Sequence, residues 1–185
     1  MTTQSSKLFT GWNRDSLYPG DTSHQELRKA CTKAINWDAL LEYASDHKNG
    51  TKCQVATQST MGSYHLVHLL RFEDGSQWIV KFQLNPSTPA TAKELQSEID
   101  TMSLIRSRTK VPVAEVYASD SQGQTVGVPF VMMEYIPGVV AMDLDGGHDV
   151  HHGQIPVHRK PIFYRAMASV QVSSHKRFQS ISASD

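Results

Sequence analysis

The sequence predicts an α+β fold, in which an antiparallel sheet carries one packed helix and further helices flank it near both ends of the chain. Two apolar runs, Leu66 to Phe72 and Gln77 to Phe82, are separated by Asp74-Gly75, a pattern typical of a β-hairpin. A stretch of helical periodicity follows at 91–106, and a strongly apolar run at 128–135 supplies another strand.

Composition limits the classes of partner. The chain has 185 residues, with 18 Lys and Arg against 18 Asp and Glu. Its net charge is therefore zero and does not indicate binding to nucleic acid or to an acidic membrane surface. Two cysteines, Cys31 and Cys53, form no disulfide framework, which favours a reducing compartment. The N-terminus lacks an apolar signal core, and no apolar run approaches the about 20 residues of a membrane span. We expect a cytoplasmic protein.

Three regions are predicted. Residues 1–50 form an N-terminal extension, in which a polar, weakly ordered lead-in to about residue 22 precedes two short helices between His24 and His47. Residues 51–138 hold the sheet and its helix. Residues 139–185 combine turn material up to about His158 with a helix from Pro161 to about Lys176.

The central region predicts the element order β-β-β-α-β-β. Its helix is expected to begin at Thr91, because Glu94 three residues later completes a capping box, and to end near Arg106. The other expected elements are a strand from Cys53 through Val55, the hairpin, an extended segment from Val111 to Tyr117, a loop from Ser119 to Gly127 and a strand from Val128 to Tyr135.

Lys81 is the first candidate functional residue. It shares one side of its strand with Ile79, while Trp78, Val80 and Phe82 point to the other side. A buried lysine needs an anionic partner, whereas a lysine on an edge strand reaches solvent, and the strand alone leaves both interpretations open. Glu98 lies inside the apolar face of the following helix and is the favoured partner. Glu94 is the alternative, with a capping role as its other interpretation.

Two backbone segments are further candidates. The loop Gln58 to Ser63 precedes the hairpin, and its small polar residues around Gly62 and Ser63 could present N–H groups to phosphate. Read alone, the loop favours an ordinary strand connection, and its position just ahead of the hairpin and Lys81 is what supports a phosphate loop. The apolar strand ending at Glu134-Tyr135-Ile136-Pro137-Gly138 suits a hinge whose free backbone groups bond an adenine edge, or simply a core strand with its turn.

Residues 53–140 resemble the small lobe of the aminoglycoside phosphotransferase family, in its fungal-type branch of kinase-like proteins. The resemblance rests on Gly62-Ser63-Tyr64, Phe72-Glu73-Asp74-Gly75, Trp78-Ile79-Val80-Lys81, Glu98, Val111-Pro112-Val113, Pro129-Phe130 and Met133 to Gly138. The helix near Phe163 and the segment Arg177-Phe178 resemble the truncated start of the family's large lobe.

The resemblance implies a protein-kinase-like small lobe and ATP-dependent phosphorylation of a small-molecule hydroxyl, with ATP and magnesium as cofactors. Lys81 would bind the nucleotide phosphates and Glu98 would pair with Lys81. The Glu134 carbonyl and the Ile136 N–H would hold adenine, and Gly62 and Ser63 would belong to the phosphate loop.

The sequence departs from the family where catalysis needs its magnesium ligands. The family's catalytic loop has the form H-G-D-x-x-x-x-N, whereas His148-Asp149 lacks the glycine and Gln154 stands where asparagine is required. Asn85 is the last asparagine in the chain. We therefore predict no catalytic and no metal-binding residues, and weak nucleotide binding without turnover.

The histidines His148, His151, His152 and His158 lie among aspartates and glycines. A zinc or nickel site is one interpretation, but a solvated loop is favoured because no HExxH spacing or cysteine partner accompanies them.

Two hypotheses from different classes follow. The chain is either a kinase-like enzyme whose catalytic half is missing from this sequence, or a non-catalytic interaction module. A lobe without its partner lobe exposes apolar surface near the hinge, which favours a protein partner, self-association or instability.

Overall fold

The computed structural model describes residues 22–138 and 141–182. The described residues divide into two compact units, one made of residues 22–108 and 112–136, the other of residues 109–111, 137–138 and 141–182. The predicted lead-in up to about residue 22 falls almost entirely outside the described residues. The predicted boundaries near residues 50 and 138 stay a prediction.

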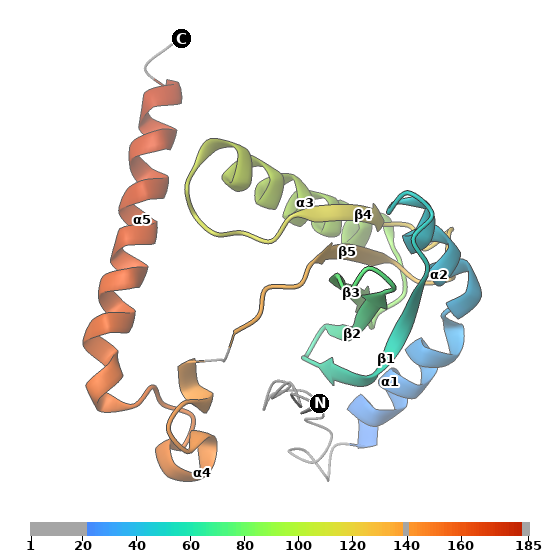
Figure 1. The fold of residues 1–185 in the computed structure, drawn as a ribbon, viewed down its shortest axis with the longest axis horizontal. Coiled ribbons are helices and arrows are strands. Elements are labelled where there is room, and N and C mark those ends of the chain that lie inside the picture. Colours follow the sequence, from blue (N-terminus) through green and yellow to red (C-terminus); the bar gives the residue numbers. More distant parts are fainter. Residues whose placement is uncertain (1–21, 139–140, 183–185) are drawn as a thin grey trace. The chain divides into compact units, whose positions relative to one another are not determined.

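A five-stranded antiparallel sheet forms the centre of the larger unit (Figure 1). Its spatial order is β1-β2-β3-β5-β4, and every neighbouring pair is antiparallel. The strands are β1 (Cys53–Met61), β2 (His65–Phe72), β3 (Gln77–Gln83), β4 (Val116–Asp120) and β5 (Phe130–Glu134). The predicted α+β fold, with its β-β-β-α-β-β order and its hairpin around Asp74-Gly75, is confirmed.

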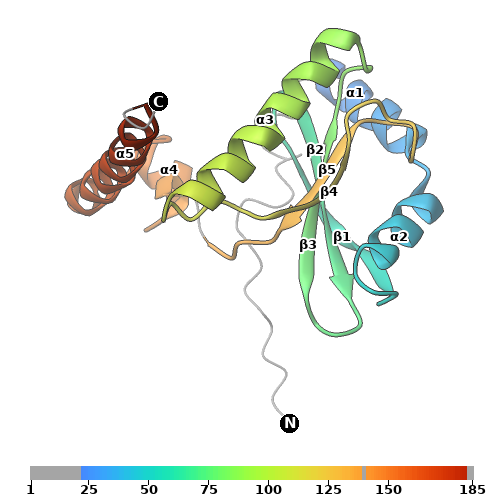
Figure 2. The same cartoon turned by 90° about the horizontal axis from the view of Figure 1, so that it is seen from above.

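Helices cover both faces of the sheet. Figure 2 shows α3 (Pro89–Arg108) on one side, with α1 (Thr22–Ala34) and α2 (Trp37–Asp46) on the other. The predicted alternation along β3 explains this arrangement: Trp78, Val80 and Phe82 belong to the core on the α1 and α2 side. Ile79 packs against the second cluster, which contains Leu95 and Ile99 of α3. The N-terminal helices therefore complete the main core of the sheet.

The helix α3 begins two residues before the predicted start. The Thr88 N–H donates to Thr91 Oγ1 over 2.9 Å, and the Thr91 N–H donates to Thr88 Oγ1 over 3.2 Å. This is a capping box with Thr88 as the N-cap. The predicted box of Thr91 and Glu94 is wrong, because Pro89 is compatible with the first helical position, where a backbone N–H is not needed.

Two strand boundaries also differ from the expectation. Strand β1 continues through an irregularity between Val55 and Ser59 and ends at Met61, so only residues 62–64 connect it to β2. The predicted loop from Gln58 to Ser63 is therefore wrong for Gln58 to Met61, which belong to β1. Strand β4 extends to Asp120, whose carboxylate accepts the backbone N–H groups of Gln122, Gly123 and Thr125. These bonds place the turn after Asp120 instead of at Ser119.

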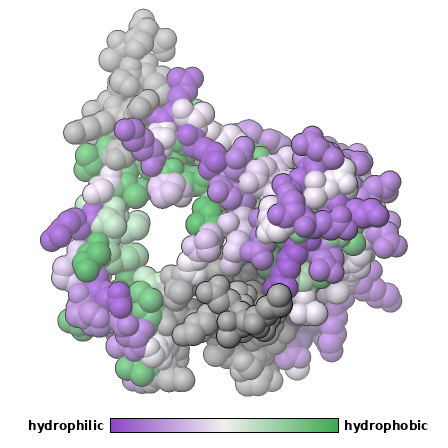
Figure 3. All heavy atoms as spheres, viewed as in Figure 1, coloured by the Kyte–Doolittle hydropathy of each residue, from purple (hydrophilic) through white to green (hydrophobic). Residues whose placement is uncertain are grey.

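The smaller unit is helical in its described part. It contains α4 (Gly147–His151), α5 (Lys160–Ser182) and 3₁₀ turns at Ala141–Asp143 and Val157–Arg159. The predicted C-terminal helix is present and longer than expected. Figure 3 shows hydrophobic residues along α5 among hydrophilic ones, and four exposed large side chains on this helix are Ile162, Tyr164, Met167 and Val172. No helix in the described residues is long and apolar enough to cross a membrane.

Candidate functional site

Lys81 lies in an apolar part of the sheet. Its cross-strand partners are Val67 on β2 and Val131 on β5. The side chain is only 18% exposed, so the ammonium group cannot rely on water alone for solvation. The sheet therefore places a charged group where an anionic partner is needed.

Glu98 supplies that partner. The Lys81 ammonium donates a hydrogen bond to Glu98 Oε1, forming an ion pair between β3 and α3. Glu98 is next to the buried positions Leu95 and Ile99 on the helix, although its own side chain is 42% exposed. The pair that sequence analysis favoured is present, and Glu94 does not pair with Lys81.

A pocket of about 260 Å³ opens beside this ion pair. It is lined by Tyr64, His65, Gln83, Asn85, Thr91, Glu94, Leu95 and Glu98. Gln83 contributes an amide whose Nε2 donates to the Thr91 carbonyl over 3.5 Å, while its buried Oε1 has no hydrogen-bond partner among the described residues. The pocket joins the β1–β2 turn to the first turns of α3.

His65 is a site residue that sequence analysis missed. Burial is the main cause that lowers the pKa of His65 below its usual value; Lys81 lowers it further, and Glu98 opposes this effect. The register gives the reason for its position, since His65 is two residues before Val67, the partner of Lys81, and so shares its face of the sheet. The alternation of β2 could have revealed it.

The β1–β2 turn holds Gly62 and Ser63. The Gly62 N–H donates to the His65 carbonyl over 3.0 Å, and the Leu84 N–H donates to the Tyr64 carbonyl over 3.0 Å. Gly62, Ser63 and Tyr64 are exposed. A Cβ at Gly62 would meet no atom within 4 Å, so local packing does not require glycine at this position.

The end of β5 is held by the side chain of its last residue, Glu134. Glu134 Oε2 accepts the Glu115 N–H over 3.1 Å and a hydrogen bond from Arg106 Nη1 over 3.2 Å. Ile136, two residues on, is 49% exposed. Sequence analysis missed Arg106 because its partners are distant in sequence. The one local signal is a basic residue in the last turn of a helix, which usually indicates only a favourable dipole interaction.

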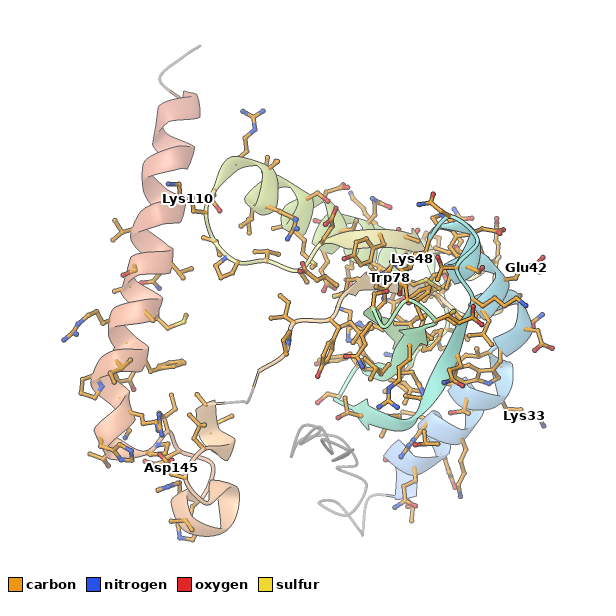
Figure 4. The ribbon with its side chains drawn as sticks, in the orientation of Figure 1. Lys33, Glu42, Lys48, Trp78, Lys110 and Asp145 are labelled. Atoms are coloured by element: carbon orange, nitrogen blue, oxygen red, sulfur yellow. The ribbon has the colours of Figure 1, made fainter. Side chains whose placement is uncertain are left out.

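The described part of the histidine cluster is organised around Asp145 (Figure 4). Its carboxylate pairs with Arg159, over 2.7 Å from Nε, and with His158, over 3.1 Å. His151 Nε2 lies 3.0 Å from the Asp145 carbonyl oxygen. Hydrogen bonding from Arg159 is the main cause that lowers the pKa of Asp145. The side chains of His148 and Asp149 are not among those described.

The side chains available as ligands decide whether this chain fits the family's magnesium site. The family's metal-binding asparagine has no counterpart, since Asn85 is the last asparagine in this sequence. Within residues 22–138 and 141–182, no three His, Cys, Asp or Glu side chains are grouped as metal ligands. The residues present do not fit the family's magnesium site, and no reaction step through magnesium is assigned to them.

The family model of the phosphotransferase enzyme family matches residues 62–158, which is just over half of the chain. The chain belongs to this family, and the matched residues include β2 to β5 and α3. The match does not separate branches, so the fungal-type branch stays a prediction.

One solved structure that is similar to this chain is a crystal structure of a candidate aminoglycoside phosphotransferase from Ralstonia eutropha JMP134. The TM-score is 0.45 and the sequence identity is 21%, with 60% of this chain and 32% of that chain covered. This chain therefore spans about a third of the length of that protein. None of the curated proteins matches.

Proposed function

We propose that Lys81 and its surroundings form the phosphate end of an ATP site in a kinase-like small lobe. The parent activity would be ATP-dependent phosphorylation of a small-molecule hydroxyl, carried out in the cytoplasm. The observation that supports the proposal best is the Lys81–Glu98 ion pair between β3 and α3. In kinases such a pair holds the lysine against the nucleotide phosphates.

The other predicted site residues fit the same proposal. Gly62 and Ser63 lie in the exposed turn before β2. The Gly62 N–H bonds the His65 carbonyl, so the proposed phosphate donors are the other N–H groups of this turn. Glu134 and Ile136 would hold the adenine edge through their backbone groups. Residues 51–138 would be the small lobe, and residues 139–185 the entry into the large lobe.

This chain by itself is proposed to bind nucleotide weakly without transferring its phosphate. Phosphoryl transfer needs a positioning aspartate and metal-bound oxygens. The sequence His148-Asp149 lacks the preceding glycine of the family's catalytic loop, and Gln154 replaces its asparagine. Any magnesium would enter with the nucleotide.

The test is a calorimetric titration with Mg-ATP. Wild type is expected to bind weakly, and Lys81→Ala about tenfold more weakly or not at all, because a charge-assisted hydrogen bond to phosphate is lost. Lys93→Ala is the matched control, since it removes an exposed lysine from α3. Identical titrations for wild type and Lys81→Ala, or no heat for either, would overturn the nucleotide site.

A second candidate function is a non-catalytic interaction module. The observation that favours it is the exposure of large hydrophobic side chains on α5, including Ile162 at 68% and Tyr164 at 60%, which is typical of surfaces that contact another protein. Light scattering would test self-association: a concentration-dependent mass that Ile162→Ser abolishes supports this candidate, and a constant monomer mass counts against self-association.

A further inference from the structure

Arg106 connects three parts of the larger unit. Its Nη1 donates to the Val113 carbonyl over 2.7 Å and to Glu134 Oε2 over 3.2 Å, while its Nη2 donates to Glu115 Oε2 over 3.0 Å. The planar guanidinium presents its donors in a fixed fork, which a lysine cannot reproduce. A single side chain at the end of α3 therefore bonds both the segment before β4 and the end of β5.

Glu134 and Glu115 are also bonded to each other. The Glu134 N–H donates to the Glu115 carbonyl over 2.8 Å, and the Glu115 N–H donates to Glu134 Oε2 over 3.1 Å. The Glu134 carboxylate therefore has both a backbone donor and a cationic donor. These bonds fix the backbone at the last residue of β5, immediately before Tyr135 and Ile136.

The same helix reaches the other end of the proposed site. Glu98, the partner of Lys81, precedes Arg106 by two turns of α3, a rise of about 12 Å. The helix thus bonds Lys81 at one point and the end of β5 at another. Movement of α3 would change both positions together.

Arg106 contributes more to position than to stability. The side chains of Arg106, Glu115 and Glu134 are 42%, 50% and 37% exposed, and ion pairs with this exposure stabilise folded proteins only slightly. We propose that Arg106 is a positioning residue, which holds the Glu134–Ile136 backbone where it can bond the adenine edge. This inference rests on the proposed ATP site.

Binding of two different ligands can distinguish an effect at the adenine end of the proposed site from an effect at its phosphate end. ATP would use both ends, whereas inorganic tripolyphosphate would use only the surroundings of Lys81. Arg106→Lys and Arg106→Gln are expected to weaken ATP binding about 3- to 10-fold, the loss of one or two positioned hydrogen bonds, and to leave tripolyphosphate binding within about twofold. Lys81→Ala should weaken the binding of both ligands.

Arg108→Gln is the matched control. It removes an exposed arginine two residues away on the last turn of α3 and should leave the binding of both ligands unchanged. Hydrogen exchange gives a readout that does not depend on a ligand: Arg106→Lys should speed exchange at the Glu115 and Glu134 amides and leave strand β2 unchanged.

The outcomes are distinct. If wild type binds ATP and both Arg106 variants bind it equally well, the positioning role is overturned and the ATP site stands. An equal loss for ATP and tripolyphosphate, or failure of both Arg106 variants and of Glu134→Gln to fold, would make the contacts structural and also overturn it. If wild type binds neither ligand, the ATP site fails and the positioning role fails with it.

Discussion

The carbonyl oxygen of Ala34, at the end of α1, lies directly against Gly127 in the loop before β5. A Cβ added to Gly127 would lie 2.5 Å from this oxygen. Close by, the N–H of Asn36, two residues after Ala34, donates to the carbonyl of Val126, the residue before Gly127, over 2.8 Å. This close backbone contact docks the N-terminal helices onto the loop that leads into the central strand β5.

Replacement of Gly127 by alanine should therefore be unusually costly. Gly127 has a φ of +91°, a conformation that costs a residue with a Cβ about 1–2 kcal/mol, and the clash with the Ala34 backbone adds a similar amount. We expect Gly127→Ala to lower the free energy of unfolding by about 3 kcal/mol or more, measured by urea denaturation. Gly75→Ala is the control, because Gly75 has a φ of +83° with open space around it. Equal losses would show that the contact with Ala34 is unimportant.

His68 should make stability depend on pH. Burial is the main cause that lowers the pKa of His68 from 6.5 to about 4, with Arg28 adding to the effect, and its Nδ1 has no hydrogen-bond partner among the described residues. The ring packs edge-on against Trp37 and Phe82. The folded state therefore favours the neutral ring.

The sign follows from proton binding. Between pH 6.5 and 4 the unfolded chain binds this proton and the folded chain does not, so the contribution is fully present above pH 6.5 and is lost as the pH falls toward 4. The loss amounts to up to about 3 kcal/mol. Urea unfolding from pH 7.5 to 4.5 should show a steeper fall for wild type than for His68→Leu, which keeps an apolar group in the core. Parallel curves would contradict the role of His68.

Thr88 should stabilise α3 as its N-cap. Thr88→Ala removes the hydroxyl that accepts the Thr91 N–H, and loss of such a cap costs about 1 kcal/mol. Thr101→Ala is a control within the same helix, because its hydroxyl only bonds the Ser97 carbonyl one turn earlier and alanine favours helix more. Differential scanning calorimetry should show a lower Tm for Thr88→Ala only. An unchanged Tm for Thr88→Ala would contradict the role of Thr88 as N-cap.

Lys81 is expected to be unnecessary for folding. Its neighbours across the sheet are Val67 and Val131, and Glu98, which would lose its partner, is 42% exposed and can be hydrated by water. Lys81→Met should therefore change the free energy of unfolding by no more than about 1 kcal/mol, while removing nucleotide binding.

Lys48→Met provides the contrast for this measurement. Lys48 pairs with Asp74 over 3.0 Å and its ammonium lies 5.3 Å from the ring centre of Phe72 and 5.7 Å from that of Trp78 (Figure 4). The Lys48→Met variant should have a lower free energy of unfolding than wild type, because the faces of these two rings attract a cation. If Lys81→Met is the more destabilised of the two, the ion pair of Lys81 serves the fold.

The sequence predicted the elements that local patterns determine. The alternation from Trp78 to Phe82 assigned the two faces of β3, and Asp74-Gly75 located the hairpin, because both signals depend on neighbouring residues alone. The Lys81–Glu98 pair could be expected because a charge on each of two apolar faces has few ways to be satisfied.

Features that depend on distant residues could not be predicted in this way. Arg106 finds acceptors at positions 113, 115 and 134, and no local pattern indicates such a set. Strand β1 continues through Ser59, whose buried hydroxyl accepts a 2.6 Å hydrogen bond from Arg28 of α1, a partner 31 residues away in sequence. The choice between Thr88 and Thr91 as N-cap was a local question, decided by the tolerance of proline in the first turn.

The strand order has a consequence for how the chain acquires its fold. Strand β3 is paired on one side by β2, its neighbour in sequence, and on the other by β5, which is made only after the whole of α3 and β4. Until β5 arrives during synthesis, the backbone of Gln77–Gln83 presents an open row of donors and acceptors to any other strand. Insertion of β5 is a long-range step, and we expect it to be slow compared with formation of the β2–β3 hairpin. The centre of the finished sheet is therefore the part of the nascent chain most exposed to aggregation.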